Sequence, residues 1–313
     1  MDPQDVKKTL VVGAGVMGHS IAQVFAAAGI EVALVDIDRK VLDHAMKMIA
    51  NNLKTLSEFG RIDPAAVGDI IDRIHPTTDI YAAATGVDFA LEAVVEVPDV
   101  KKKVFADLEA AAPPHAVLAS NTSGLDLFGF LEPNDPSRFI VTHWFAPPHI
   151  IPLVEVAPGP KTDPAVVEFV ASLMTRIGKR PVVMRQFVRS FIVNRIQNYI
   201  FMAVMEILGN GWATPEEIDY AVKMSLGMRL PVVGVVQTYD FTGLDLVLDI
   251  IKNHGLSYPI VEDKVKEGNL GAKTGKGFFD YGGRSEEEIM KKRDELYLKM
   301  GDFLETLNGF RPV

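Results

Sequence analysis

Cysteine is absent from this sequence, so neither a disulfide nor thiol chemistry contributes to the protein. Long uncharged apolar stretches are also missing, and the first residues, Met1 to Asp5, are too acidic for a signal or transit peptide. Basic residues are fewer than acidic ones, since the sequence has 32 Lys and Arg and 41 Asp and Glu, which gives a net charge of −9. This balance argues against nucleic acid or an anionic membrane as the main partner. We therefore expect a cytoplasmic protein that acts on a small molecule, and no spacing of His, Asp or Glu predicts a metal site.

The strongest motif that is present occupies residues 6–36. An apolar run at 9–12 predicts a buried strand, and a helical pattern that ends near Gly29 follows a glycine-rich turn. A second apolar run ends in Asp36, about 20 residues beyond the turn, which is the usual place for the acid of a dinucleotide-binding unit. The turn itself reads Gly13-Ala14-Gly15-Val16-Met17-Gly18.

Each residue type in this motif suits a dinucleotide. Gly13 permits the tight turn, Gly15 lets a pyrophosphate approach the backbone, and Gly18 lets the helix pack close to the strand. The free N–H groups around Val16 and Met17 would bind the phosphates. Asp36 would accept from ribose hydroxyls and repel a 2′-phosphate, which favours NAD over NADP. A strand–helix–strand unit without a cofactor is the alternative, and the order of the elements makes it the weaker one.

The rest of the chain, 313 residues in all, is long enough for two domains. Helices are expected at 39–59 and 64–74, forming a helical hairpin at about 39–74. The sequence then predicts alternating strands and helices up to residue 185: strands within 80–93 and at 117–119, 139–142, 153–156 and 181–184, helices at 99–112 and 164–177. The predicted class is α/β, with a Rossmann-type doubly wound sheet over 1–185.

From about residue 186 the periodicity is helical, with no strands between, which predicts an all-α C-terminal domain over 186–313. Thr214 followed by Pro215 and two acids is a typical helix start. Residues 189–208 are apolar nearly all round, so this helix should be buried. We therefore expect a homodimer that forms through the C-terminal domain.

Hydride transfer needs a base, a group that orients the base, and donors to the substrate oxygen. His143 and Glu155 fit the first two roles, because a Pro-rich loop and a return strand separate them. Ser123 and Asn194 are short polar donors in apolar surroundings. The alternatives are a histidine satisfied in a core loop, His149 as the base, and purely structural capping by the two donors.

Several separated motifs together resemble the L-3-hydroxyacyl-CoA dehydrogenase family, along nearly the whole chain. They are GAGVMG with Asp36, EAVVE at 92–96, SNTSG at 120–124, His143 with LVEV at 153–156, FIVNR at 191–195, ATPEEIDYAVK at 213–223, DFTGLD at 240–245 and KTGKGFF at 273–279. The resemblance implies reversible oxidation of a 3-hydroxyl to a 3-keto group with NAD, as in fatty acid metabolism, by a protein that is usually dimeric. It implies His143 as general base, Glu155 as its orienting partner, and Ser123 and Asn194 as donors around the substrate oxygen. It also implies NAD contacts from Asp36, Glu96, Lys101, Ser123 and Lys273.

The departures from the family pattern lie around the substrate. The usual FFNP after the histidine is replaced by residues 144–147, WFAP, and Pro-Gly before FIVNR is replaced by Arg189-Ser190. The hairpin has Asn52 and few lysines, and the usual GYPMGP turn reads GMRLP, with Arg229. We therefore expect Asn52, Arg189 and Arg229 to contact the substrate.

Three functions follow from these observations. The leading one is an NAD-dependent 3-hydroxyacyl-CoA dehydrogenase. The alternative is a relative that oxidises a free hydroxy acid or carboxylated alcohol of the gulonate or pyridine-carboxylate type, with Arg185, Arg189 or Arg229 holding the carboxylate. For any single arginine, a surface salt bridge is the competing interpretation. A non-catalytic dinucleotide-binding structural protein is the remote alternative, because it would not need the set Ser123, His143, Glu155 and Asn194.

Overall fold

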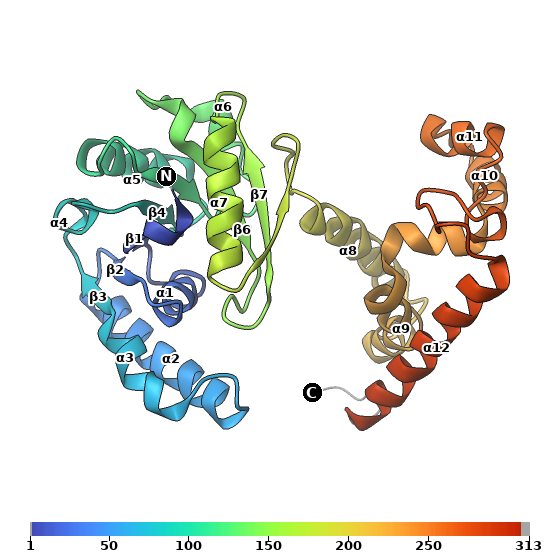
Figure 1. The fold of residues 1–313 in the computed structure, drawn as a ribbon, viewed down its shortest axis with the longest axis horizontal. Helices are drawn as coiled ribbons and strands as arrows, with labels where there is room; N and C mark the ends of the chain where they lie inside the picture. The colour runs from blue at the N-terminus through green and yellow to red at the C-terminus, as the bar shows by residue number, and fades with distance from the viewer. Residues whose placement is uncertain (1, 308–313) are drawn as a thin grey trace. The chain divides into compact units, whose positions relative to one another are not determined.

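The computed structural model describes residues 2–307, and its internal contacts divide the chain into two compact units, Met1–Tyr199 and Ile200–Val313 (Figure 1). Each unit is described separately below. The division falls inside a helix, whereas the helical periodicity begins near residue 186, so the domains 1–185 and 186–313 stay a prediction. Within residues 2–307, no helix has both the length and the apolarity needed to cross a bilayer.

The described part of the first unit contains one sheet of eight strands in the order β3-β2-β1-β4-β5-β6-β7-β8. All neighbouring pairs are parallel except β6 and β7, which are antiparallel. This arrangement confirms the predicted Rossmann-type doubly wound sheet. The strands are β1 (Lys8–Val12), β2 (Glu31–Val35), β3 (Ile74–Thr77), β4 (Phe89–Glu92), β5 (Val117–Ser120), β6 (Phe139–Trp144), β7 (Leu153–Pro158) and β8 (Arg180–Val183).

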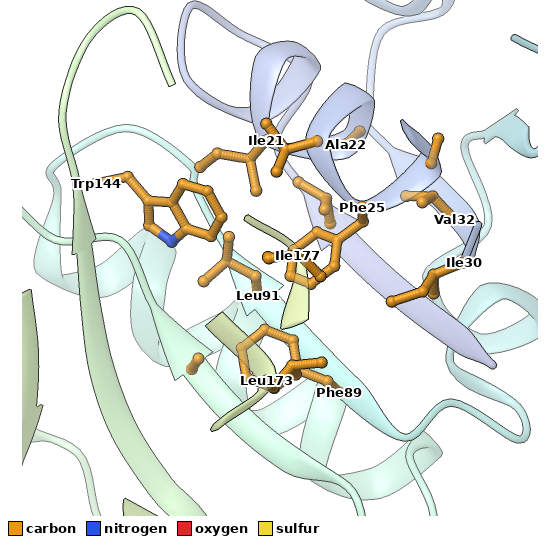
Figure 2. Packing of buried hydrophobic residues seen from close by; sticks show 14 of the residues in the cluster. Ile21, Ala22, Phe25, Ile30, Val32, Phe89, Leu91, Trp144, Leu173 and Ile177 are labelled. Atoms are coloured by element: carbon orange, nitrogen blue, oxygen red, sulfur yellow. The ribbon is translucent and has the colours of Figure 1, made fainter. Parts of the chain in front are cut away.

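Helices cover both faces of this sheet, which explains why its inner strands are apolar on both sides. One hydrophobic cluster contains Val11 of β1 with residues of helices α1, α2 and α7, and a second contains Leu10 with residues of α4, α5 and α6. Figure 2 shows the first cluster, in which Phe25 of α1 and Trp144 of β6 lie near each other. The helices are α1 (Gly18–Ala27), α2 (Arg39–Glu58), α3 (Val67–Asp72), α4 (Ile80–Ala84), α5 (Pro98–Ala111), α6 (Leu127–Phe130) and α7 (Pro164–Arg176).

Two predicted elements are wrong in part. The helix expected over 64–74 ends at Asp72, and Ile74 begins the edge strand β3. This strand is stabilised by main-chain hydrogen bonds to β2, which a local sequence pattern does not predict. The strand character expected from residue 80 begins only at β4. Residues Ile80–Ala84 form α4 because the Asp79 side chain caps the N–H groups of Tyr81 and Ala82.

The second unit is helical over its described residues. It contains the C-terminal part of α8 (Val193–Gly209), then α9 (Pro215–Thr242), α10 (Leu244–Asn253), α11 (Pro259–Lys266) and α12 (Glu286–Thr306). The predicted start at Thr214 is confirmed, because Thr214 and Glu217 form a reciprocal capping box. The expectation that the apolar helix near 189–208 is buried is wrong for the single chain, since no residue of α8 is buried. Several of its apolar side chains, among them Ile196, Tyr199 and Phe201, are exposed because no other part of the described chain covers them.

Asp240 organises the loop between α11 and α12. It is buried, and its carboxylate accepts hydrogen bonds from the N–H groups of Phe278 and Phe279 and from the Tyr281 hydroxyl, at 2.9, 3.0 and 3.2 Å. A Cβ added at Gly277 would lie 2.4 Å from the Asp240 carboxylate, so glycine is required where the loop passes this acid. Burial, followed by the negative charge of Asp240, raises the pKa of Tyr281 to about 12.

We expect Asp240→Asn to lower the free energy of unfolding by about 2–4 kcal/mol, because one oxygen acceptor is replaced by an NH₂ group that faces other donors. Urea unfolding followed by circular dichroism measures this. Asp245→Asn is the matched control, since it removes a carboxylate that is half exposed and paired with Lys273, and it should cost less than about 1 kcal/mol. Equal losses in the two variants would contradict the anchoring role of Asp240.

Candidate functional site

The turn between β1 and α1 has the geometry that a pyrophosphate needs. Gly13 has φ +98°, and a Cβ there would lie 2.6 Å from the Ala93 carbonyl oxygen. A Cβ at Gly18 would lie 1.7 Å from the Gly13 carbonyl oxygen, whereas a Cβ at Gly15 would meet no atom within 4 Å. Gly13 and Gly18 are therefore needed by the fold itself, and Gly15 opens the backbone to a ligand. At the start of α1, Met17 supplies no side-chain cap, which leaves the N–H groups there for phosphate oxygens.

Asp36 lies directly beside this turn. One carboxylate oxygen accepts from the Ala14 N–H at 2.9 Å and the other from the Asp38 N–H at 3.1 Å. The next residue, Ile37, and Val16 in the turn are exposed apolar side chains. An acid and exposed aliphatic groups around an open glycine turn fit the ribose and base of a dinucleotide.

His143 and Glu155 form the centre of the second part of the site. They are directly opposite each other in the antiparallel pair β6–β7, so their side chains share one face of the sheet. The His143 Nδ1 lies 2.9 Å from the Glu155 carboxylate, and both residues are buried, with 4% and 1% of their surface exposed. The other oxygen of Glu155 accepts from the N–H groups of Ile192 and Val193, each at 3.0 Å, where α8 begins. A helix N-terminus and two N–H donors stabilise the negative charge of this buried carboxylate.

Asn194 connects His143 to the loop after β5. Its Nδ2 lies 3.3 Å from His143 Nε2 and 3.2 Å from the Ser123 carbonyl oxygen. Because an amide NH₂ has two donor hydrogens, it can donate to both, which makes Nε2 the acceptor and Nδ1 the protonated nitrogen that donates to Glu155. Ser123 itself is exposed in the loop after β5.

A network of carboxylates and hydroxyls fixes the Ser123 loop. Glu96 accepts from the Thr122 hydroxyl and, at 2.9 Å, from the Ser123 N–H, and its other oxygen lies 3.0 Å from Lys101 Nζ. Lys101, only 1% exposed at its side chain, also binds the fully buried Glu92 at 2.7 Å. Burial by itself raises the pKa of Glu96, but the Thr122 hydroxyl and the Lys101 charge outweigh it and leave that pKa below its usual value.

Sequence reasoning missed the roles of two residues in this region. The sequence gives Glu92 no role beyond its place in the motif at 92–96, although its carboxylate accepts from the Ser120 hydroxyl at 2.5 Å and from Lys101. Phe191 stacks on His143, with ring centroids 4.7 Å apart. Both belong to quoted motifs, EAVVE and FIVNR, but the contacts join segments far apart in the chain, which no spacing reveals.

His149, the alternative candidate for the base, is hydrogen-bonded to helix α1. Its Nδ1 lies 2.6 Å from the Ser20 hydroxyl of α1, and burial, followed by the nearby His19 and Lys179 charges, lowers its pKa. Lys179 donates to the carbonyl oxygens of Pro148 and Ile151 and so holds the loop after β6, while burial lowers the pKa of this lysine to about 8.

A cleft of about 860 Å³ lies beside this loop, between α1, the end of α2 and the α7–β8 turn. Its lining includes Ala27, Thr55, Phe59 and Ile150, with Arg61 and Lys179 among its charged residues. Gln23 also lines it and is buried, and its Oε1 has no hydrogen-bond partner within residues 2–307. We call this the α1–α2 cleft.

Of the four remaining predicted residues, Asn52 and Arg189 belong to the first unit, and neither has a contact with the His143 cluster that the structure shows among its described residues. Asn52 lies on α2, and its Nδ2 is buried without a partner within residues 2–307. Arg189 is exposed just before α8. Arg229 and Lys273 belong to the second unit, where Arg229 donates to Ser225 and Lys273 binds Asp245 at 2.5 Å. Their proposed contacts with substrate or cofactor stay predictions.

The chain is similar to known proteins along most of its length. The family model for the 3-hydroxyacyl-CoA dehydrogenase NAD binding domain matches residues 8–187, and the model for the C-terminal domain of the same family matches residues 191–281. A probable 3-hydroxybutyryl-CoA dehydrogenase from Bacillus subtilis is 33% identical over 88% of this chain and 98% of its own length.

Relatives with other substrates match as well. The 5-formyl-3-hydroxy-2-methylpyridine 4-carboxylate 5-dehydrogenase of Mesorhizobium japonicum is 28% identical over 88% of this chain and 91% of its own. Among solved structures, the 3-hydroxyacyl-CoA dehydrogenase of Archaeoglobus fulgidus has a TM-score of 0.77 at 29% identity, covering 97% of this chain and 99% of that one. The glycine turn, Asp36 and the matched NAD-binding domain confirm the prediction of NAD. The chain belongs to the 3-hydroxyacyl-CoA dehydrogenase family and is an NAD-dependent oxidoreductase of that type.

Proposed function

We propose that this protein catalyses the reversible oxidation of the 3-hydroxyl of a 3-hydroxyacyl-CoA to a 3-keto group, with His143 as the general base. The observation that carries this proposal is the buried His143–Glu155 pair, 2.9 Å apart, with the second imidazole nitrogen turned to the Asn194 amide. An imidazole held in this way keeps its acceptor lone pair at Nε2, which can take the proton of a substrate hydroxyl that replaces the Asn194 amide as its partner.

Each residue then has a separate task. Glu155 fixes the tautomer and compensates the positive charge that His143 gains when it takes the hydroxyl proton. Asn194 and the Ser123 hydroxyl donate to the substrate oxygen, which becomes more negative as its proton leaves. Bound NAD supplies the oxidant, taking up two electrons and the hydrogen of the carbinol carbon. For the reverse reaction, protonated His143 returns its proton to the oxygen.

NAD would be held by the glycine turn of residues 13–18, by Asp36 at the adenosine ribose, and by Glu96 and Ser123 at the other end. Lys101 is buried beneath Glu96, so we propose that it acts on the cofactor by fixing the Glu96 carboxylate. The contact of Lys273 with NAD remains part of the proposal that rests on the family resemblance.

The α1–α2 cleft supports a CoA thioester as substrate. A pantetheine arm is a long apolar chain with amide groups, and the cleft offers apolar walls at Ala27 and Ile150 and a buried acceptor at Gln23 that lacks a partner. Arg61 at the same cleft is exposed and would meet a phosphate.

A free hydroxy acid is the second candidate substrate. Arg185 and Arg189 are exposed beside the start of α8, where a carboxylate could be bound, and a relative named for a pyridine carboxylate matches the chain along most of its length. Fewer residues favour this candidate, because neither arginine contacts the His143 cluster in the structure.

We also propose that the protein is a homodimer formed through the helical domain. The exposed apolar residues of α8 include Ile196, Tyr199, Ile200, Phe201 and Met205, and covering them would remove apolar surface from water. A second copy would bury them at a symmetric interface.

His143→Gln should lower kcat by about 10²–10⁴-fold, because the amide cannot accept a proton from the substrate. NADH binding, followed by fluorescence, should be unchanged, since His143 lies outside the glycine turn. Steady-state turnover of acetoacetyl-CoA with NADH measures the loss. Full activity in this variant would show that another group is the base.

We expect NADH to reduce acetoacetyl-CoA but not free acetoacetate, and NAD to oxidise neither L-gulonate nor aromatic hydroxy acids. NADPH should reduce acetoacetyl-CoA more weakly than NADH, because Asp36 repels the 2′-phosphate. Thr55→Trp, which narrows the α1–α2 cleft, should raise KM for acetoacetyl-CoA. Lys54→Trp places the same ring on the same helix outside the cleft lining and should leave KM unchanged. Activity with a free acid alone would instead assign specificity to the arginines.

Light scattering coupled to size-exclusion chromatography should give twice the mass of one chain. Phe201→Glu should give one chain's mass, because a charge would be buried at the interface. Asn210→Glu adds the same charge at an exposed polar position just beyond α8, so it should remain dimeric. A wild-type protein with the mass of one chain would contradict the dimer.

A further inference from the structure

The backbone immediately before α8 is strained at two consecutive residues. Ser190 has φ +64° and Phe191 has φ +50°, and neither is glycine. Left-handed conformations are unfavourable for residues with a Cβ, and for a bulky residue such as phenylalanine they are rare. Such strain persists where the surrounding structure requires that conformation, and it concentrates at functional sites.

The strained turn directs the Phe191 ring onto the catalytic histidine. Phe191 is 1% exposed, and its ring lies on the His143 imidazole with a centroid distance of 4.7 Å and an interplanar angle of 22°. Phe145 contacts the same imidazole edge-on, at 4.6 Å and 63°. The imidazole is therefore enclosed by two aromatic rings, one of which covers a face.

The same turn also arranges the donors to Glu155. The residues that follow Phe191, Ile192 and Val193, are the ones whose N–H groups bind the Glu155 carboxylate. The Ser190 carbonyl oxygen accepts from the Arg195 N–H at 2.9 Å and so joins the turn to the first turn of α8. One short segment thus holds both members of the pair, the imidazole through a ring and the carboxylate through the backbone.

A stacked aromatic ring has two physical effects on a histidine base. It prevents rotation of the imidazole about its χ2 angle, so that Nδ1 keeps facing Glu155 while Nε2 keeps facing the substrate. Its electron-rich face also attracts the imidazolium that forms when His143 takes the hydroxyl proton. Both effects act on the reacting state of His143 and neither requires contact with substrate or NAD.

We propose that Phe191 is a positioning residue for the dehydrogenase reaction, which holds the His143 imidazole in its reacting orientation and stabilises its protonated form. This inference rests on the proposed role of His143 as general base. It predicts that loss of the aromatic ring lowers kcat while the affinities for substrate and cofactor are unchanged.

The competing explanation is that Phe191 only fills the core. It belongs to an aromatic cluster in which Phe187 contacts both Phe191 and Phe128, at centroid distances of 5.7 and 5.5 Å. Phe187 is therefore a matched control, since it shares the cluster and has no ring contact with His143 among the described residues.

The test compares Phe191→Leu, Phe191→Met and Phe187→Leu in the reduction of acetoacetyl-CoA by NADH, with kcat expressed per NADH-binding site so that only folded protein is counted. We expect both Phe191 variants to lose about tenfold in kcat with unchanged KM and NADH affinity. Phe187→Leu should keep the wild-type kcat even where its melting temperature falls. Methionine fills an irregular cavity well, so Phe191→Met still tests the proposal if Phe191→Leu does not fold.

Wild-type kcat in either folded Phe191 variant would overturn the proposal, as would an equal loss of kcat in Phe187→Leu. His143→Gln measured in the same assay separates this result from a failure of the proposed function. If His143→Gln is inactive while a Phe191 variant is fully active, only the role of Phe191 is wrong. If His143→Gln is active, the assignment of the base is wrong.

Discussion

The Glu155 carboxylate is the interaction on which the site depends. One of its oxygens holds His143 and the other accepts two N–H groups from the residues that begin α8, so a single buried charge joins the strand hairpin to the helix. A buried carboxylate is stable only when its oxygens are fully paired, and here both are. The imidazole, the carboxylate and the start of α8 must therefore form together.

A second network connects the cofactor side of the sheet to the same histidine. Glu96 holds the backbone of Ser123, whose carbonyl oxygen binds Asn194, which in turn faces His143. Lys101 supplies the positive charge that compensates the fully buried Glu92 and the partly exposed Glu96 beside it. Residues proposed to contact NAD and residues proposed to act on the substrate are thus connected by one continuous set of hydrogen bonds.

Local patterns in the sequence were sufficient to predict much of the fold. The apolar runs and the glycine turn of residues 9–36 predicted β1, α1 and β2, and Thr214 predicted the start of α9, because strand burial and helix capping depend on neighbouring residues. The edge strand at Ile74 and the helix at Ile80 were misassigned. The strand exists through its pairing with β2, and the helix is too short for a periodic signal, so local propensity gives a weak indication of either.

Residue identity and order in the chain were sufficient to predict the family, the NAD-binding turn and the pairing of His143 with Glu155. The last of these could be predicted because a hairpin places residues on either side of a short loop opposite each other. Three-dimensional packing was needed to show that Glu155 is bound by the backbone of Ile192 and Val193, that Lys101 lies buried between two acids, and that Phe191 covers the imidazole. Those contacts join segments that are far apart in sequence. Their partners are set by how the helices and strands pack, and no spacing along the chain encodes them.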